Sequence, residues 1–334
     1  MPSSKLVVDA VLAPDLPPAR APDFLQLPHS DQATVRNELI QGLRATPAFT
    51  APKYLYDALG SRLFEAITEL PEYYPTRTEA AIFEAHAAAM AECVPAAATL
   101  VDLGAGNCKK AARLFSVLKP RRYVAVDISV DFLREALGNL QLRFPALEML
   151  GVGMDFSSTL ALPLQAGSGP RVLFYPGSSI GNFTPAEALV FLQQAHKACK
   201  GGGLLVGVDL VKPADLLEPA YDDELGVTAA FNRNLLPHLN RLIGTDFNLS
   251  EWKHLAFFNA QKSRIEMHLQ AVQAVQVRWP GGERRFAAEE RIHTENSYKW
   301  QQADFAALLK AAGFTQTQAW TDERGWFAVF WAQA

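Results

Sequence analysis

Apolar positions between residues 99 and 210 alternate between short continuous runs and longer stripes with helical spacing. The runs predict buried strands, and the stripes predict amphipathic helices. The expected strands cover residues 99–103, 122–127, 147–152, 171–175 and 203–210, and the expected helices cover 111–118, 131–142 and 185–199. Repeated βα units of this kind predict an α/β fold with a doubly wound parallel sheet.

The pattern changes on both sides of this region. Residues 1–30 lack periodicity and hold four prolines within 13–22, which predicts an extended lead-in without chemistry. The expected helices are 30–43, 78–90, 222–242 and 303–312, the expected strands are 262–271, 274–279, 315–320 and 326–331, and the stretch 68–78 is rich in turn residues. We interpret 31–90 plus 212–295 as a smaller substrate domain, and 91–211 plus 296–334, closed by an antiparallel strand pair, as the main domain.

Composition and residue spacing limit the kinds of partner and site that the protein can have. The 334 residues include 31 Lys plus Arg and 35 Asp plus Glu, a formal charge of −4, which favours a small-molecule partner over nucleic acid. The three cysteines lack CxxC spacing and the histidines lack HxxxH spacing, so we expect neither disulfides nor a metal site. Because no run of about 20 apolar residues and no leader pattern is present, we expect a cytoplasmic protein without a membrane partner.

Three short motifs follow the first three expected strands. Gly104 and Gly106 form the first loop, Asp127 ends the second strand where an acid can accept ribose hydroxyls, and Asp155 with Phe156 ends the third, where adenine could bind. Taken singly, these residues are equally consistent with a tight turn, a helix cap and a surface acid beside a core aromatic ring. NAD and S-adenosylmethionine both use such a set, but Lys109 replaces the third glycine of GxGxxG. The chain therefore looks like a class I S-adenosylmethionine methyltransferase with a Rossmann-like sheet.

A more specific resemblance comes from a longer set of motifs. The segment LPEYYPTRTE at 70–79 resembles the L-histidine Nα-methyltransferases of ergothioneine biosynthesis. Further motifs resemble that family in the same order: YD at 56–57, GSRLF at 60–64, PGSSIGNF at 176–183, YDD at 221–223, GVTAAFN at 226–232 and TENS at 294–297. The similarity covers residues 54–331. It implies three successive methyl transfers from S-adenosylmethionine to histidine, giving hercynine.

The resemblance also implies roles for individual residues. It implies that Asn182 and Tyr221 hold the substrate carboxylate, that Tyr73 lies at the reacting amine as a possible proton relay, and that Glu295 and Ser297 bind the imidazole. Tyr56 and Met267 complete the expected substrate site, with Met267 bounding it. We expect Lys110 to contact the methionine carboxylate of the cofactor. Each of these residues also has an ordinary structural explanation, and Lys299 is interpreted as a surface charge.

Other functions stay open at this point. One is an N-methyltransferase of another amino acid or small amine, which would keep the cofactor residues but lose the imidazole pair of Glu295 and Ser297. Another is a module that binds S-adenosylmethionine without turnover, and a third is a dehydrogenase. A nucleic-acid methyltransferase is disfavoured, since the sequence lacks a basic stripe. We expect the mono- and dimethylated forms of histidine to bind as well, and the protein to be a monomer.

Overall fold

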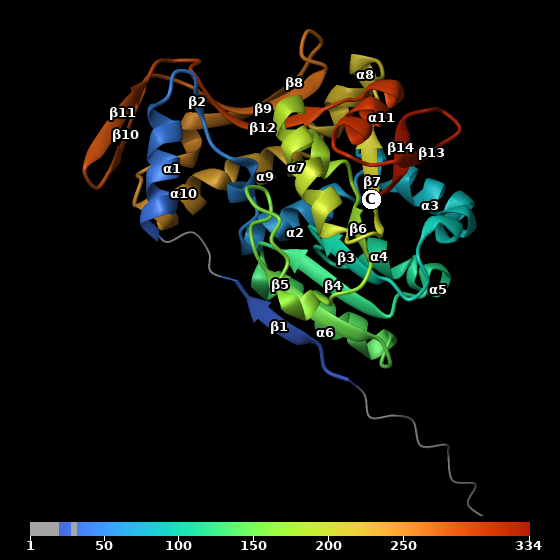
Figure 1. The fold of residues 1–334 in the computed structure, drawn as a ribbon. Helices are drawn as coiled ribbons and strands as arrows, with labels where there is room; N and C mark the ends of the chain where they lie inside the picture. The colour runs from blue at the N-terminus through green and yellow to red at the C-terminus, as the bar shows by residue number, and fades with distance from the viewer. Residues whose placement is uncertain (1–19, 28–31) are drawn as a thin grey trace, which may run out of the picture.

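An eight-stranded sheet forms the centre of the larger part of the chain (Figure 1), and the computed structural model describes residues 20–27 and 32–334. In spatial order its strands are β1 (Asp23–Gln26), β5 (Glu148–Gly153), β4 (Arg122–Asp127), β3 (Thr99–Leu103), β6 (Arg171–Tyr175), β7 (Gly203–Asp209), β14 (Phe327–Gln333) and β13 (Gln316–Thr321). The first six strands are parallel, and β14 is antiparallel to both neighbours. Chain order reverses between β3 and β6, where a doubly wound sheet leaves a crevice for ligands.

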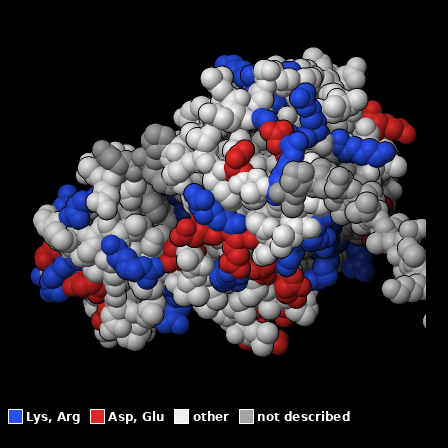
Figure 2. Space-filling model, turned by 90° about the horizontal axis from the view of Figure 1, so that it is seen from below, with Lys and Arg blue, Asp and Glu red and all other residues white. Residues whose placement is uncertain are grey.

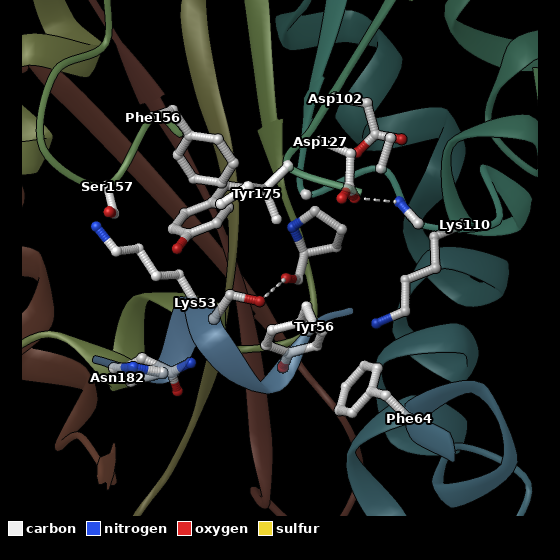
Figure 3. A pocket seen from close by; sticks show the side chains of 18 of the residues that line it. Lys53, Tyr56, Phe64, Asp102, Lys110, Asp127, Phe156, Ser157, Tyr175 and Asn182 are labelled. Atoms are coloured by element: carbon white, nitrogen blue, oxygen red, sulfur yellow. Dashed lines mark hydrogen bonds between the residues drawn. The ribbon is translucent and has the colours of Figure 1, made fainter. Parts of the chain in front are cut away.

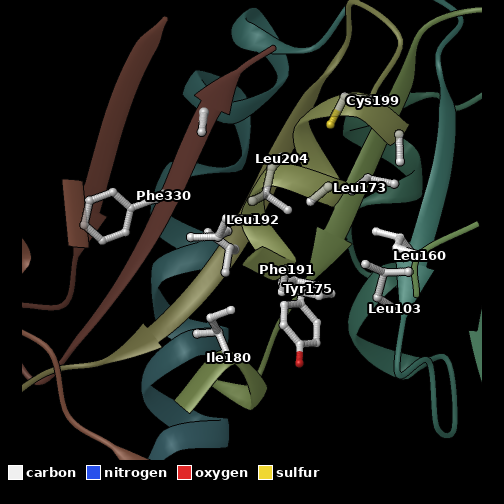
Figure 4. Close-up of a cluster of buried hydrophobic side chains, with 14 of the residues drawn as sticks. Leu103, Leu160, Leu173, Tyr175, Ile180, Phe191, Leu192, Cys199, Leu204 and Phe330 are labelled. Carbon is white, nitrogen blue, oxygen red and sulfur yellow. The ribbon is translucent and has the colours of Figure 1, made fainter. Parts of the chain in front are cut away.

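Helices cover both faces of this sheet. They are α3 (Tyr74–Cys93), α4 (Lys109–Ala112), α5 (Phe115–Leu118) and α6 (Val130–Arg143) on one face, and α7 (Pro185–Ala198) and α11 (Gln302–Ala311) on the other. In Figure 4, Phe191 and Leu192 of α7 pack with Leu173, Leu204 and Phe330 of the sheet. Two 3-10 turns, η2 (Leu164–Ala166) and η3 (Ser179–Asn182), lie before and after β6.

A second hydrophobic core lies beside the sheet and combines two separate stretches of chain. The first stretch holds α1 (Gln32–Arg44), β2 (Ala48–Phe49), η1 (Pro52–Leu55) and α2 (Ala58–Ile67). The second holds α8 (Ala214–Leu217), η4 (Glu218–Ala220), α9 (Val227–Arg233), α10 (Leu235–Ile243), η5 (Leu249–Glu251), β8 (Trp252–Asn259), β9 (Arg264–Ala271), β10 (Val275–Trp279), β11 (Gly282–Phe286) and β12 (Arg291–Tyr298). Strands β2, β12, β9 and β8 form a four-stranded sheet, and β10 pairs with β11.

The predicted fold class is confirmed, including the parallel doubly wound sheet and the closing antiparallel pair β13–β14. The lead-in lies partly outside the described residues, but its segment Asp23–Gln26 adds a strand to the sheet. The division into two domains stays an interpretation. Packing assigns α3 differently from that division, because its Ile82, Phe83 and Met90 are buried in the core of the eight-stranded sheet.

Three local predictions were wrong. The expected helix 222–242 is two helices: Asp223 accepts hydrogen bonds from the N–H groups that begin α9, and α10 starts at Leu235 because Pro237 fits only a first turn. The stripe 111–118 is likewise two short helices, α4 and α5. Helix α3 begins at Tyr74, inside the stretch expected to be turns.

The described surface carries mixed charge. On the face seen in Figure 2, acidic and basic side chains lie next to one another, in agreement with the formal net charge of −4. Within the described ranges, no helix combines the length and the apolar character needed to cross a membrane.

Candidate active site

A cavity of about 890 Å³ opens where the parallel strands β3, β4, β5 and β6 end. Cavities of roughly 300–1,000 Å³ are typical of small-molecule sites. Figure 3 shows Phe156 and Tyr175 on one side of it and Lys110 on the other. All six residues predicted for the cofactor line this cavity: Gly104, Gly106, Lys110, Asp127, Asp155 and Phe156.

The glycine loop and Asp127 are held together by hydrogen bonds. Gly104 and Gly106 have φ angles of 72° and 51°, in the left-handed region where a side chain would be strained. The N–H of Gly106 donates to Asp127 Oδ2 at 2.9 Å, and the N–H of Ser129 donates to Oδ1 at 2.8 Å. With these contacts the carboxylate still keeps at least one lone pair for a ligand. Burial raises the pKa of Asp127, and the N-cap of α6 is Ser129, so Asp127 is not the helix cap.

Asp155 links the cavity to the N-terminal segment. Its Oδ1 accepts from the N–H of Ser157 at 2.9 Å, and its Oδ2 accepts from Lys53 Nζ of η1 at 3.1 Å. Lys53 also donates to Glu38 of α1 at 2.9 Å. Burial opposes ionisation of Asp155, but the hydrogen bond from Ser157 and the charge of Lys53 lower its pKa overall. The predicted adenine contact would therefore share this carboxylate with Lys53, which the sequence analysis did not single out.

Lys110 forms an ion pair at the opposite wall. Its Nζ donates to Glu79 Oε2 at 2.7 Å, and the N–H of Gly177 donates to Glu79 Oε1 at 2.7 Å. Glu79 is only 1% exposed. Among the described residues Glu79 alone accepts from Lys110, so two of the three ammonium N–H groups are left for a ligand carboxylate. Glu79 was missed because it lies mid-helix in α3, where an acid normally faces solvent.

Asp102, at the end of β3, is a further acidic group that sequence reasoning missed. Its Oδ2 accepts from the Tyr123 hydroxyl at 2.7 Å, whereas Oδ1 is buried and has no partner within the described chain. Burial raises the pKa of Asp102 to about 7. An unpaired carboxylate oxygen, a glycine loop and a lysine around one cavity fit S-adenosylmethionine, whose ribose, ammonium and carboxylate need acceptors and donors.

A second cavity of about 40 Å³ adjoins the first. It is lined by all seven residues predicted for the substrate: Tyr56, Tyr73, Asn182, Tyr221, Met267, Glu295 and Ser297. Since one water occupies about 10–15 Å³ on this kind of measure, the space suits a small ring but not a whole amino acid. Tyr56, Tyr73 and Asn182 also line the large cavity, so the two cavities meet at these side chains.

The far end of the small cavity is polar and buried. A register shift in β12 between His293 and Glu295 turns Glu295 and Ser297 toward the side of the sheet that Met267 of β9 occupies. Glu295 is 7% exposed, and its carboxylate has no hydrogen-bond partner among the described residues. Burial raises the pKa of Glu295 to about 8, although Lys299 opposes the shift. An unpaired carboxyl group in a cavity is available to a ring nitrogen.

Aromatic side chains enclose the junction of the two cavities. Tyr56 packs edge-on against Phe64 and Phe231, with centroids 5.6 and 5.5 Å away, and Tyr73 lies 6.3 Å from Tyr221. Burial raises the pKa of Tyr73 well above its usual value, and the nearby Tyr221 and Glu295 add to the shift. Its hydroxyl therefore stays protonated near neutral pH and can accept a hydrogen bond, but it cannot act as a phenolate base.

A separate polar cluster lies on the other face of the four-stranded sheet. Glu266, His268 and His293 place potential metal-ligating atoms within 4.8 Å of one another. Glu266 is already paired, since Arg264 donates to its Oε1 at 2.6 Å and His268 Nε2 lies 3.1 Å from its Oε2. Because Arg264 neutralises the carboxylate, we treat this cluster as part of the sheet's hydrogen bonding. The absence of a metal site stays a prediction.

Comparisons with known proteins agree over almost the whole chain. A family model described as histidine-specific methyltransferase, SAM-dependent, matches residues 35–334. A histidine N-alpha-methyltransferase of Mycolicibacterium smegmatis is 41% identical over 304 residues, covering 88% of this chain and 93% of that protein. One of Mycobacterium tuberculosis is 39% identical over 302 residues, with coverages of 88% and 93%. Ergothioneine biosynthesis protein 1 of Neurospora crassa is 30% identical over 281 residues, covering 80% of this chain and 31% of that protein.

These matches confirm the family resemblance that was inferred from the motifs. The matched range includes the linings of both cavities, from Glu38 to Ser297. The roles of the individual site residues stay predictions, whereas the enzyme class and the cofactor of the family are settled by the match. The chain belongs to the family of histidine-specific methyltransferases that depend on S-adenosylmethionine.

Proposed function

We propose that the protein transfers methyl groups from S-adenosylmethionine to the α-amino nitrogen of L-histidine, three in succession, to give hercynine for ergothioneine biosynthesis. The observation that carries the proposal is the junction of the two cavities at Tyr73 and Asn182. A ring bound at Glu295 places the amino acid backbone at this junction, next to the cofactor cavity. This arrangement supports a reaction at the α-amino group rather than at the ring.

The polar groups suit a zwitterionic amino acid with an imidazole side chain. The Asn182 amide and the Tyr221 hydroxyl can donate to the substrate carboxylate from two different segments. Glu295 and Ser297 can pair the two ring nitrogens, while Tyr56 and Met267 enclose the ring. A buried site of this kind penalises side chains that leave Glu295 and Ser297 without partners.

Position and charge complementarity then account for catalysis. The cofactor supplies a sulfonium methyl group and its own leaving group. The residues of the chain hold the amine in line with that methyl group, which is the main requirement of direct transfer to a neutral nitrogen. The Tyr73 hydroxyl orients the amine by accepting one of its N–H groups. The raised pKa of Tyr73 points to water rather than phenolate as the proton acceptor.

Repeated methylation requires room at the nitrogen. The junction opens into the larger cavity, which also has to hold the cofactor, so methyl groups added to the nitrogen face that cavity rather than the packed core. A different amino acid or small amine remains the second candidate for the substrate. That alternative leaves the buried carboxyl group of Glu295 unpaired, which makes it less favourable.

A direct experiment is to incubate the purified protein with S-adenosylmethionine and each of the 20 amino acids in parallel. Product masses then report one, two or three added methyl groups. Three additions to histidine alone are expected. Turnover of another amino acid in preference to histidine would overturn the proposed substrate, and binding of the cofactor without any turnover would overturn the proposed reaction.

A pair of variants tests the proposed ring contacts. Glu295→Ala should lower the preference for histidine over other amino acids by about 10- to 100-fold, because a buried ring nitrogen loses its partner. Glu283→Ala, at an exposed position of β11, is the matched control and should keep that preference. If Glu295→Ala keeps the preference too, Glu295 does not bind the ring.

A further inference from the structure

Behind the polar end of the small cavity lies a buried group of charged side chains. Asp209, at the end of β7, accepts hydrogen bonds from Lys212 at 2.5 Å and from Lys299 at 2.7 Å. The Tyr74 hydroxyl also donates to Asp209, at 2.6 Å, and accepts from Lys212 at 3.0 Å. Lys299 is 3% exposed, so its interpretation as a surface charge was wrong. Two ammonium groups face one carboxylate here, which leaves a net positive charge.

Lys299 connects this group to the cavity. Besides Asp209, its Nζ donates to Ser297 Oγ at 2.8 Å and to Tyr221 Oη at 2.9 Å. These three acceptors use all three N–H groups of the ammonium. The two hydroxyl oxygens lie 2.7 Å apart and share a hydrogen bond with each other.

The count of hydrogens restricts what these hydroxyls can offer a ligand. Ser297 and Tyr221 have two hydroxyl hydrogens between them, and one of these lies in the hydrogen bond that joins them. Because Lys299 has no acceptor position, neither hydroxyl can donate to it. The pair therefore presents one hydrogen to the cavity. If Tyr221 donates its hydrogen to the ligand, Ser297 donates to Tyr221. If Ser297 donates to the ligand, Tyr221 donates to Ser297.

We propose that Lys299 is a positioning residue that makes Ser297 a hydrogen-bond acceptor toward the substrate ring when Tyr221 donates to the substrate carboxylate. A negatively charged carboxylate takes the free hydrogen from Tyr221, since charge-assisted hydrogen bonds are the stronger ones. Ser297 then donates to Tyr221, accepts from Lys299 and keeps one lone pair for a ring N–H. The proposal rests on the function proposed above and adds a requirement for a ring that carries an N–H donor.

The requirement determines how the other ring nitrogen is paired. A neutral imidazole has one N–H and one bare nitrogen. With the N–H at Ser297, the bare nitrogen meets Glu295, whose carboxyl group is a donor when protonated. The raised pKa of Glu295, about 8, supports this pairing near neutral pH. The two contacts then pair both nitrogens of a neutral imidazole.

The test compares histidine with β-(4-thiazolyl)-L-alanine, whose ring keeps a nitrogen acceptor but has sulfur in place of N–H. Lys299→Met removes the three donors while leaving Asp209 paired one-to-one with Lys212. The variant should lower kcat/KM for histidine about 10- to 100-fold, mainly through KM. Because Lys299 also donates to Tyr221, which holds the carboxylate of either substrate, kcat/KM for the thiazole should fall as well, but clearly less than for histidine, so the selectivity between the two substrates decreases.

Two further measurements separate positioning from a structural role. Lys212→Met removes the other lysine of Asp209, which does not touch the hydroxyl pair, and should destabilise the fold while keeping the selectivity. In the Ser297→Ala background, Lys299→Met should have little further effect on selectivity, since the group it orients is gone. This double-mutant cycle remains informative even where the single variant is less stable.

The outcomes distinguish the two proposals. If the wild-type enzyme methylates histidine and Lys299→Met reduces both substrates equally, or if its effect persists in full without Ser297, Lys299 is structural and the inference fails. If the wild-type enzyme does not methylate histidine at all, the proposed function fails instead.

Discussion

The backbone N–H of Gly106 donates to the carboxylate of Asp127 at 2.9 Å, which ties the glycine loop after β3 to the end of β4. Asp127→Asn keeps the size of the side chain but turns an amide donor toward the N–H of either Gly106 or Ser129. We expect the affinity for S-adenosylmethionine to fall about 10- to 100-fold in a calorimetric titration. Asp131→Asn, exposed on α6 and outside the cavity, should bind as the wild type does. Unchanged binding by Asp127→Asn would remove Asp127 from the cofactor site.

The hydroxyl of Tyr73 can be tested without disturbing its ring. Tyr73→Phe should lower kcat about tenfold or more, because the amine loses one orienting contact. Since burial raises the pKa of Tyr73 well above neutral, the shape of the pH–rate profile should be the same in both enzymes. Tyr54→Phe loses only a hydroxyl that donates to Glu38 and should keep kcat. A limb of the profile that disappears in Tyr73→Phe would show that Tyr73 ionises during turnover.

Glu295 makes stability depend on pH in a direction opposite to most acids. Burial raises its pKa from 4.5 to about 8, so the folded protein keeps a proton that the unfolded chain releases between these values. The favourable contribution of Glu295 to the free energy of unfolding is therefore fully present below about pH 4.5 and is lost as pH rises toward 8. The loss is about 1.4 kcal/mol for each pH unit between the two pKa values.

Glu295→Gln removes that loss. The free energy of unfolding of the variant, relative to that of the wild type, should therefore be higher at pH 9 than at pH 5. Urea unfolding of both proteins at the two pH values measures the difference. Glu283→Gln reports the effect of the same change at an exposed position of β11. A wild-type to Glu295→Gln difference that stays constant with pH would contradict the burial of a neutral carboxyl group.

Two helical glycines should respond to alanine with opposite signs. A Cβ at Gly138 of α6 meets no atom within 4 Å, so Gly138→Ala should stabilise the fold by about 1 kcal/mol through helix propensity. A Cβ at Gly42 of α1 would lie 2.3 Å from the carbonyl oxygen of Phe49, so Gly42→Ala should destabilise it. Chemical denaturation of both variants tests the close packing of α1 on β2. Equal changes in stability for the two variants would contradict that packing.

The sequence predicted β3 to β7 and β14 of the large sheet well, because these strands are almost entirely buried and appear as continuous apolar runs. Strand β12 escaped prediction for the opposite reason. It places Glu295 and Ser297 toward the inside and contains a register shift, so neither alternation nor an apolar run marks it. The segment was recognised from its motif, not from its hydrophobic pattern.

The site residues divide in a similar way. Those in short polar motifs, such as Asn182 and Tyr221, could be predicted from their resemblance to a family. Lys299 could not, because a lysine next to a strand is most often exposed and its partner Asp209 is 90 positions away. Asp209 itself could have been noticed as a candidate polar group, because it is the last residue of β7 just as Asp127 is the last residue of β4.

The strand β1 has a consequence for the behaviour of the protein in solution. Its four residues pair with Leu150–Gly153 and close one border of the large sheet, and Phe24 fills the space over Gly151. Without them, β5 would present unpaired N–H and C=O groups to neighbouring molecules, as an unprotected edge strand does. A chain shortened to begin at Asp31 should therefore self-associate with rising concentration, which light scattering would detect. The segment Asp23–Gln26, to which no chemistry was assigned, would thus reduce aggregation by covering β5.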